Sequence, residues 1–164
     1  MARTHLLRAS DLAAGWTVHR ASPGGSRPCS DPPAVATIVG PSGAGAVFGP
    51  RGNLPVLLEY LIDGSATSAS YLDAIERLET PSSCAETVDG QTESSTFEQV
   101  IAAPHFGDRS VAMLVSDDAD GTVTEVGYNV VHAGSTVLVV GYADAGPLDT
   151  AALDRFTRLA LRRL

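Results

Sequence analysis

Five apolar stretches in the middle and second half of the chain have the length and composition of β-strands. Residues 56–62, VLLEYLI, form a nearly continuous apolar run between Pro55 and the Asp63-Gly64 pair, which is typical of a buried strand. The other four are STFEQVIA, SVAMLVSD, TVTEVGYNVVH and STVLVVGYA, in that order. Only the short turns DADG and HAGS separate the last three, so we expect those strands to be antiparallel neighbours.

Two segments show the 3.6-residue spacing of amphipathic helices. Residues 65–80, SATSASYLDAIERLET, place apolar side chains three residues apart from Leu72 onward and end before a proline. A second helix is predicted from Asp149, a good N-cap residue, through Leu164. The apolar stripe of that helix is Leu153, Phe156, Leu159 and Ala160, and its arginines are Arg155, Arg158, Arg162 and Arg163.

The order of these elements predicts an α+β fold in a single domain over residues 1–164. Residues 4–15 suggest a helical opening that leads into a short strand at 16–19. Helices are segregated from the strands instead of alternating with them, which argues against a Rossmann-type sheet. We therefore expect an antiparallel sheet of about five to six strands with helices packed on one face, including the C-terminal helix.

The charge and the hydropathy of the chain argue against two kinds of interaction, with nucleic acid and across a membrane. The chain has 19 acidic and 11 basic residues, the latter all arginine, and a net charge of −8. Nucleic acid is therefore not an expected partner, because its phosphates require clustered cations. No run of about 18 apolar residues is present, so we expect no transmembrane segment. The residues after Met1 lack the apolar core of a signal peptide, so export would require a leader upstream.

The two cysteines, Cys29 and Cys84, lie far apart in the sequence and form no C-x-x-C motif, which excludes a cysteine-rich zinc site. They are either a disulfide or two buried thiols. Both occur in the polar segments SRPCSD and TPSSCAE, which we expect to be loops, whereas unpaired structural thiols prefer apolar cores. This favours a Cys29–Cys84 disulfide and an oxidising compartment.

The glycine-rich segment GPSGAG, residues 40–45, partly matches a nucleotide-binding P-loop. Ala46 and Val47 follow it, where a P-loop requires a lysine and a hydroxyl residue. The flanking pattern is also reversed, because a short helix is expected before the glycines and a strand after them. The segment is therefore predicted to be a turn that enters a β-strand.

No metal or cofactor is predicted. The segment SDDADGTVTE would place calcium ligands at Ser116, Asp118 and Asp120, but Gly127 stands where a bidentate glutamate is needed. Strand-like residues flank this segment, whereas an EF-hand needs helices, so an acidic hairpin turn is favoured. The four histidines show no metal-ligand spacing.

Catalytic motifs are weak. The G-x-S-x-G elbow of serine hydrolases fails around Ser42, because Ala44 occupies the position of the last glycine. The most compact polar cluster is PHFGDRS, which contains His105 and Asp108. It could form the polar rim of a ligand cleft, and the alternative is a turn capped by the aspartate. His132 alternates with Tyr128 along its strand and could face a core or a cleft.

The order of features resembles the actinobacterial extracytoplasmic sensor-domain family, the type of the PknH kinase ectodomain and related lipoproteins. The resemblance rests on LLRASDLAAGW, the two cysteines, the segment VLLEYLIDGSATSASYLDAIERLET, FGDRSVAMLV, the hairpin VGYNVVHAGSTVLVVGY and the C-terminal helix. It implies an antiparallel sheet with flanking helices, a cleft for an unidentified ligand, and an extracytoplasmic location, either secreted or membrane-anchored. Family members often carry two disulfides, whereas this chain has cysteines for one.

The favoured hypothesis is a non-enzymatic ligand-binding or sensor-like domain, whose partner is an unknown small molecule or a cell-envelope component. Four aromatic residues are expected to line or border the cleft, although core packing is an equal alternative for each. They are Trp16, Tyr60, Tyr128 and Tyr142. One alternative is a small-molecule enzyme of the cyclase or isomerase type that uses His132, His105 and Asp108 as general acid and base. Another is an interaction domain of the cell envelope, which would expose an apolar patch.

Overall fold

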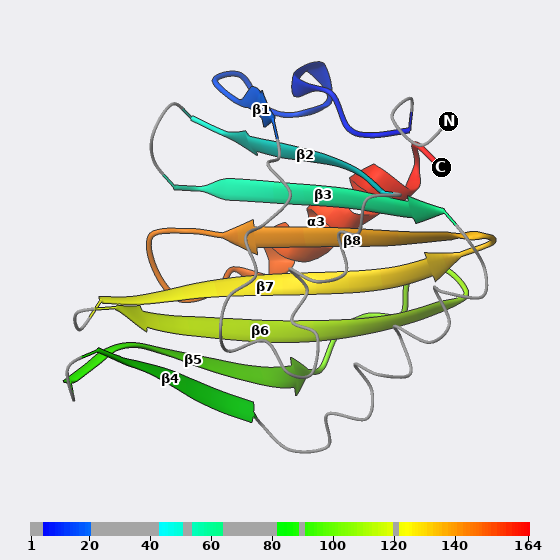
Figure 1. Ribbon diagram of the computed structural model, residues 1–164. Helices are drawn as coiled ribbons and strands as arrows, with labels where there is room; N and C mark the ends of the chain where they lie inside the picture. The colour runs from blue at the N-terminus through cyan, green and yellow to red at the C-terminus, as the bar shows by residue number, and fades with distance from the viewer. Residues whose placement is uncertain (1–4, 21–42, 51–53, 64–81, 89–90, 120–121) are drawn as a thin grey trace.

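Eight antiparallel strands form one sheet in the part of the chain that the computed structural model describes, which is residues 5–20, 43–50, 54–63, 82–88, 91–119 and 122–164. Their order across the sheet is β1-β2-β3-β8-β7-β6-β5-β4 (Figure 1). The strands are β1 (Thr17–Arg20), β2 (Gly43–Gly49), β3 (Val56–Asp63), β4 (Ser82–Val88), β5 (Gln91–Ile101), β6 (Arg109–Ala119), β7 (Thr122–Ala133) and β8 (Thr136–Ala143).

The α+β class and the antiparallel sheet are confirmed, but the strand count exceeds the expected five to six. One additional strand is β4, so the expectation that Cys84 lies in a loop was wrong: its backbone pairs with Thr96 of β5. Because β4 is at the edge of the sheet, it pairs on one side only and its sequence is mostly polar. Cys29 lies outside the described residues, so the disulfide remains a prediction.

The glycine-rich segment enters the sheet earlier than expected. Gly43 already pairs with Ile62, and β2 runs beside β3 from that residue onward. The described part of the segment is thus strand and not turn, with no helix after it on which a phosphate could sit. Residues 40–42 and the short helix expected before them lie outside the described residues.

The centre of the sheet is the β7–β8 hairpin, which the HAGS turn predicted. Ala133 pairs with Thr136, so Gly134 and Ser135 form the connection, and Gly134 has a φ of +62° that favours glycine. In this tight turn the two long apolar strands become adjacent, as expected for a two-residue hairpin loop.

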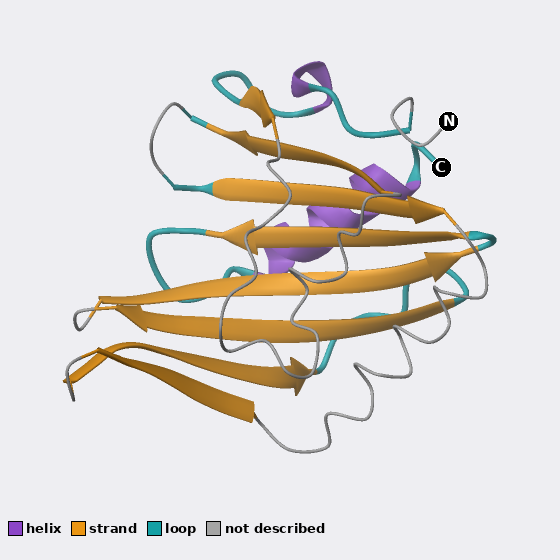
Figure 2. Cartoon of the chain, viewed as in Figure 1, coloured by secondary structure: helices purple, strands orange, loops and turns teal. Residues whose placement is uncertain are grey.

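One α-helix is present among the described residues, α3 (Thr150–Leu161), and it crosses one face of the sheet over β8 and β7 (Figure 2). Asp149 caps it as predicted, because its Oδ1 accepts a hydrogen bond from the Ala152 N–H at 2.9 Å. The helical opening expected at residues 4–15 is instead an irregular segment with a single 3-10 turn, η2 (Ala9–Asp11). The helix predicted for residues 65–80 lies outside the described residues.

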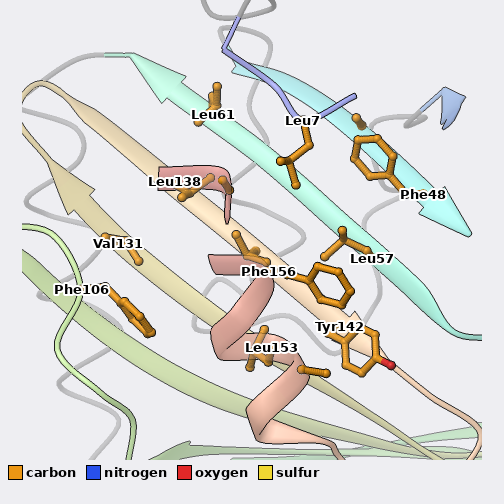
Figure 3. Packing of buried hydrophobic residues seen from close by; sticks show 14 residues of the cluster. Leu7, Phe48, Leu57, Leu61, Phe106, Val131, Leu138, Tyr142, Leu153 and Phe156 are labelled. Carbon is orange, nitrogen blue, oxygen red and sulfur yellow. The ribbon is translucent and has the colours of Figure 1, made fainter. Parts of the chain in front are cut away.

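A hydrophobic core fills the space between α3 and the sheet (Figure 3). Alternate residues of β2, β3 and β8 supply much of it, among them Leu57 and Leu61 from β3 and Leu138 from β8. Leu153 and Phe156 of α3 pack against them. The helix stripe predicted from the sequence is therefore the face that meets the sheet. No helix of the described residues is long and apolar enough to cross a membrane.

The opposite face of the sheet is also buried. Its cluster contains Ile62, Val111, Met113, Val130, Val137 and Val139, with Tyr60 and Tyr128 packed against it. Gly141 makes room for one of these rings, because a Cβ at that position would lie 2.6 Å from the ring of Tyr128. The central strands thus bury side chains on both faces, which is why they read as continuous apolar runs.

Candidate functional site

A groove of about 410 Å³ lies between the N-terminal segment and α3. One wall comes from residues 11–16, the other from α3, and Tyr142 at the end of β8 contributes to the lining. The lining residues are Asp11, Leu12, Ala13, Trp16, Tyr142, Arg155, Phe156, Arg158, Leu159 and Arg162. Its volume falls within the range of sites that hold small organic ligands.

Three aromatic rings meet in the groove. Phe156 of α3 lies edge-on to Trp16, with ring centroids 5.6 Å apart, and its ring is 5.4 Å from that of Tyr142. The Tyr142 hydroxyl donates a hydrogen bond to Asp144 Oδ2 at 3.0 Å. Burial, followed by the Asp144 hydrogen bond and charge, raises the pKa of Tyr142 to about 12, so its hydroxyl stays protonated at neutral pH. The rings offer flat apolar surface, the kind on which a ligand body packs.

Arginines line the helix wall of the groove. Arg155, Arg158 and Arg162 are three and four residues apart, so they project from one side of the helix, and all three are exposed. The Arg155 guanidinium lies 5.1 Å from the centre of the Phe156 ring, and that of Arg158 lies 5.4 Å from the Phe106 ring. No carboxylate in the described part of the chain forms an ion pair with any of the three.

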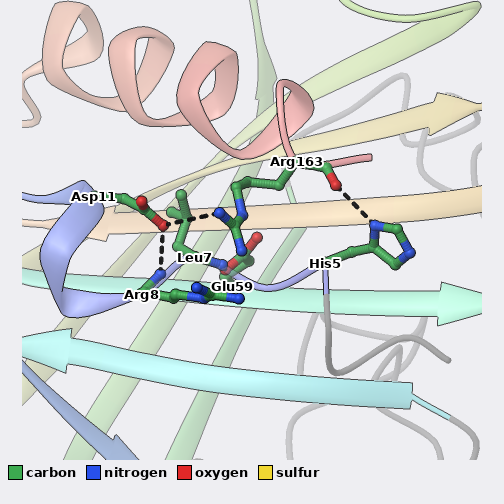
Figure 4. Close-up of polar contacts among 6 residues, drawn as sticks. All are labelled: His5, Leu7, Arg8, Asp11, Glu59 and Arg163. Atoms are coloured by element: carbon green, nitrogen blue, oxygen red, sulfur yellow. Dashed lines mark hydrogen bonds and ion pairs between the residues drawn. The ribbon is translucent and has the colours of Figure 1, made fainter.

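The acidic residue of the lining is already engaged. Asp11 Oδ2 accepts a hydrogen bond from the Arg8 backbone N–H at 2.8 Å and lies 3.7 Å from the Arg163 guanidinium (Figure 4). Neither interaction involves the groove arginines. The net electrostatic character of the groove is therefore positive, although the whole chain is acidic.

A fully buried carboxyl group lies beneath the N-terminal segment. Glu59 of β3 has no exposed surface, and its Oε2 accepts a hydrogen bond from the Leu7 backbone N–H at 2.8 Å (Figure 4). Its Oε1 has no partner within the described residues. Burial raises the pKa of Glu59 to about 7, and the hydrogen bond from Leu7 and the charge of Arg163 only partly offset this effect.

Glu59 was not among the predicted site residues, although the sequence contains a signal for it. It is the charged residue in the apolar run VLLEYLI, and it alternates with Leu57 and Leu61, which face α3. A charged residue in phase with the core face of a strand requires a partner. Here that partner is the backbone of the N-terminal segment, so Glu59 fixes the segment that carries one groove wall.

The four predicted aromatic residues are divided between the two faces of the sheet. Trp16 and Tyr142 line the groove beside α3. Tyr60 and Tyr128 pack against the cluster on the opposite face, so they cannot contact the same ligand. Their predicted role as residues that border one cleft together with Trp16 is not supported, and they fit the core-packing alternative.

The polar cluster PHFGDRS forms a turn. Asp108 Oδ2 accepts a hydrogen bond from the Gly134 N–H at 2.7 Å, and the Asp108 N–H donates to the His132 carbonyl at 2.8 Å. Gly107 has a φ of +58°, and a Cβ there would lie 2.5 Å from that carbonyl oxygen. The cluster thus secures the start of β6 to the β7–β8 hairpin, in agreement with the structural alternative.

The three acid–base candidates do not converge. His105 is exposed in the loop before β6, and the carboxylate of Asp108 is engaged by the hairpin. His132 follows Val130 by two residues on the face opposite α3, and its Nε2 is buried with no partner among the described residues. None of the three lines the groove. Among the described residues, no three His, Cys, Asp or Glu side chains gather as a metal site requires.

Comparison with known proteins found no relative of this chain. No family model, curated protein or solved structure matches the chain.

Proposed function

We propose that this chain is a non-enzymatic ligand-binding domain that takes up a small organic molecule in the groove between residues 11–16 and α3. The observation that carries the proposal is the combination, in one groove of about 410 Å³, of aromatic surface and guanidinium groups that form no ion pair with the described residues. Apolar surface with a few charged groups is the usual composition of a small-molecule site. An extracytoplasmic sensor-like role, which the family resemblance implies, is part of the same proposal.

The enzyme alternative has less support. Its candidates, His105, Asp108 and His132, lie outside the groove. Glu59, whose pKa of about 7 would suit proton transfer, is buried away from the groove lining. The interaction-domain alternative predicts one large exposed apolar patch. Instead, the exposed large apolar side chains in the described residues are distributed over five parts of the chain, and only Phe97 and Val100 share an element, β5. They are Val18, Leu54, Phe97, Val100, Val123 and Leu164.

The groove can be tested with a matched pair of substitutions in its wall. Ala13 lines the groove, whereas its exposed neighbour Ala14 does not. We expect Ala13→Phe to fill part of the groove and to weaken ligand binding by about tenfold or more, and Ala14→Phe to leave binding unchanged. Binding would be measured from the emission of Trp16, the single tryptophan of the chain, during titration with neutral, anionic and cationic organic probes.

The controls for this experiment are the thermal unfolding midpoints of both variants, which should match that of the wild type. The proposal fails if no probe changes the emission of Trp16. It also fails if the two phenylalanine variants bind every probe equally well, because binding would then occur elsewhere.

A further inference from the structure

We infer that the ligand of the groove is a small amphiphile with an apolar body and one anionic head group, a carboxylate or a phosphate. The inference rests on the proposed function and adds the chemical class of the ligand. It follows from the position of the arginines, because basic residues are fewer than acidic residues in this chain.

Positive charge is concentrated at the groove. The chain has 11 basic and 19 acidic residues, yet the groove lining contains three arginines and one aspartate. That aspartate, Asp11, is paired with Arg163, which is not part of the lining. The surrounding carboxylates are also engaged by other donors: Asp144 by the Tyr142 hydroxyl and Asp149 by the start of α3. The three guanidinium groups thus have no anionic partner within the described residues.

Helix stability does not account for all of this charge. Cations near the C-terminus of a helix are stabilised by its dipole, which explains Arg162 at the C-cap. Arg155 is the sixth of the twelve residues of α3, so it gains little from the dipole. Like charges three and four residues apart on one side of a helix also repel one another. A bound anion would relieve this repulsion.

The groove lining has an apolar part and a positively charged part, so its ligand should have an apolar part and an anionic part. Trp16, Phe156 and the leucines of the lining provide the surface for the apolar body. The Arg155 guanidinium lies over the ring of Phe156 at 5.1 Å, so the N–H groups at its edges remain available. A guanidinium held in this way presents its donors to a carboxylate or a phosphate in a fixed orientation. Arg162, about two helical turns away, supplies a second positive charge.

Four probes with the same eight-carbon chain test the head group: octanoate, octyl phosphate, 1-octanol and octyltrimethylammonium. Below their micelle concentrations, we expect the two anions to bind at least about tenfold more tightly than the alcohol, and the cation most weakly. Arg155→Gln and Arg162→Gln should each weaken octanoate binding by about three- to tenfold and leave octanol binding unchanged. Trp16 emission provides the readout.

Arg8→Gln is the matched control, because Arg8 is exposed, carries the same charge and does not line the groove. It should leave the affinity for octanoate within about twofold of the wild type. A general effect of net charge would instead weaken binding equally in all three glutamine variants, and this result would overturn the inference.

The outcomes separate the inference from the proposed function. If octanol binds as tightly as octanoate, and Ala13→Phe weakens both, the groove binds a ligand but the anionic class is wrong. If none of the four probes binds, the proposed function itself fails. If anionic phospholipid vesicles bind through the arginines and Ala13→Phe has no effect on that binding, α3 contacts a membrane surface and the small-molecule inference is overturned.

Discussion

Glu59 is an ionisable residue in apolar surroundings. Its cross-strand neighbours are Ala46 and Val140, and the next residues on its face of β3 are leucines. The carboxyl group makes one hydrogen bond, to the Leu7 N–H, and leaves its other oxygen without a partner in the described residues. Such a group is tolerated when it is protonated and becomes costly when it is ionised.

The stability of the protein should therefore depend on pH through Glu59. Its folded pKa of about 7 is above the ordinary value of 4.5, so the native state binds more protons than the unfolded state between these values. The contribution of Glu59 to the free energy of unfolding should be fully present below pH 4.5. It should fall by roughly 3 kcal/mol as the pH rises through 7.

Glu59→Gln isolates that contribution, because the amide keeps an oxygen that accepts the Leu7 N–H but cannot ionise. We expect urea unfolding at pH 5 and pH 8 to show a smaller loss of stability in the variant than in the wild type. The variant should also be the more stable protein at pH 8. If the change in stability between pH 5 and pH 8 is the same in the variant as in the wild type, Glu59 is not the titrating group.

Helix α3 is the element on which both the core and the groove depend. Its inner side carries Leu153 and Phe156 into the core, and its outer side carries the arginines. A buried polar contact fixes its rotation over the sheet: Asn129 Nδ2 donates to Thr157 Oγ1 at 2.9 Å, and that hydroxyl donates to the Leu153 carbonyl at 2.9 Å. The groove arginines therefore have a defined direction relative to β7.

The N-cap of α3 offers a test at this scale. Asp149→Ala removes the oxygen that accepts the Ala152 N–H, so we expect a loss of about 1 kcal/mol in the free energy of unfolding. Asp149→Asn retains a capping oxygen and should lose at most a few tenths of that amount. Denaturant unfolding of the two variants measures the difference, and equal losses would mean that the charge and not the cap contributes.

Some elements were predictable from the sequence and others were not, for physical reasons. β3, β6, β7 and β8 were predicted because long apolar runs with short turns have few other interpretations. β4 was missed because an edge strand satisfies its backbone on one side without needing apolar side chains. The N-terminal segment was expected to be helical, but it is irregular, and its Leu7 N–H donates to the Glu59 carboxyl group instead of to a helical carbonyl.

The candidate site was only partly predictable, because local patterns do not give the phase of one strand relative to the next. Alternation along β3 shows that Tyr60 and Glu59 face opposite sides of the sheet. Only the register between β3 and β8, which places Tyr142 opposite Leu57, shows that Tyr142 lies on the face with the groove. Trp16 and Phe156 come together only through the fold. The arginines of α3 were evident in the sequence. That they line a groove could not be predicted, because residues 11–16 form its other wall only in the folded chain.

At the scale of the whole molecule, the N-terminal segment, the sheet and α3 belong to one core. Leu7 and Phe156 are members of the same buried cluster, and Trp16 packs against it. We therefore expect the chain to unfold in one cooperative transition. The midpoints from Trp16 emission and from far-UV circular dichroism should coincide in urea. An earlier transition in the emission of Trp16 would mean that the groove wall opens while the sheet stays folded.

The two ends of the described chain are joined at one corner of the molecule. His5 Nδ1 donates to the Arg163 carbonyl at 2.8 Å, although 158 positions separate the two residues. A short glycine-serine linker that joined residue 5 to residue 163 would therefore close the chain between these two positions into a ring with little distortion. New ends could be cut after Ser135, in the exposed hairpin connection away from the groove, which leaves the hydrogen bond from the Gly134 N–H to Asp108 in place. The order of the strands along the chain could thus be permuted while their arrangement in space is kept.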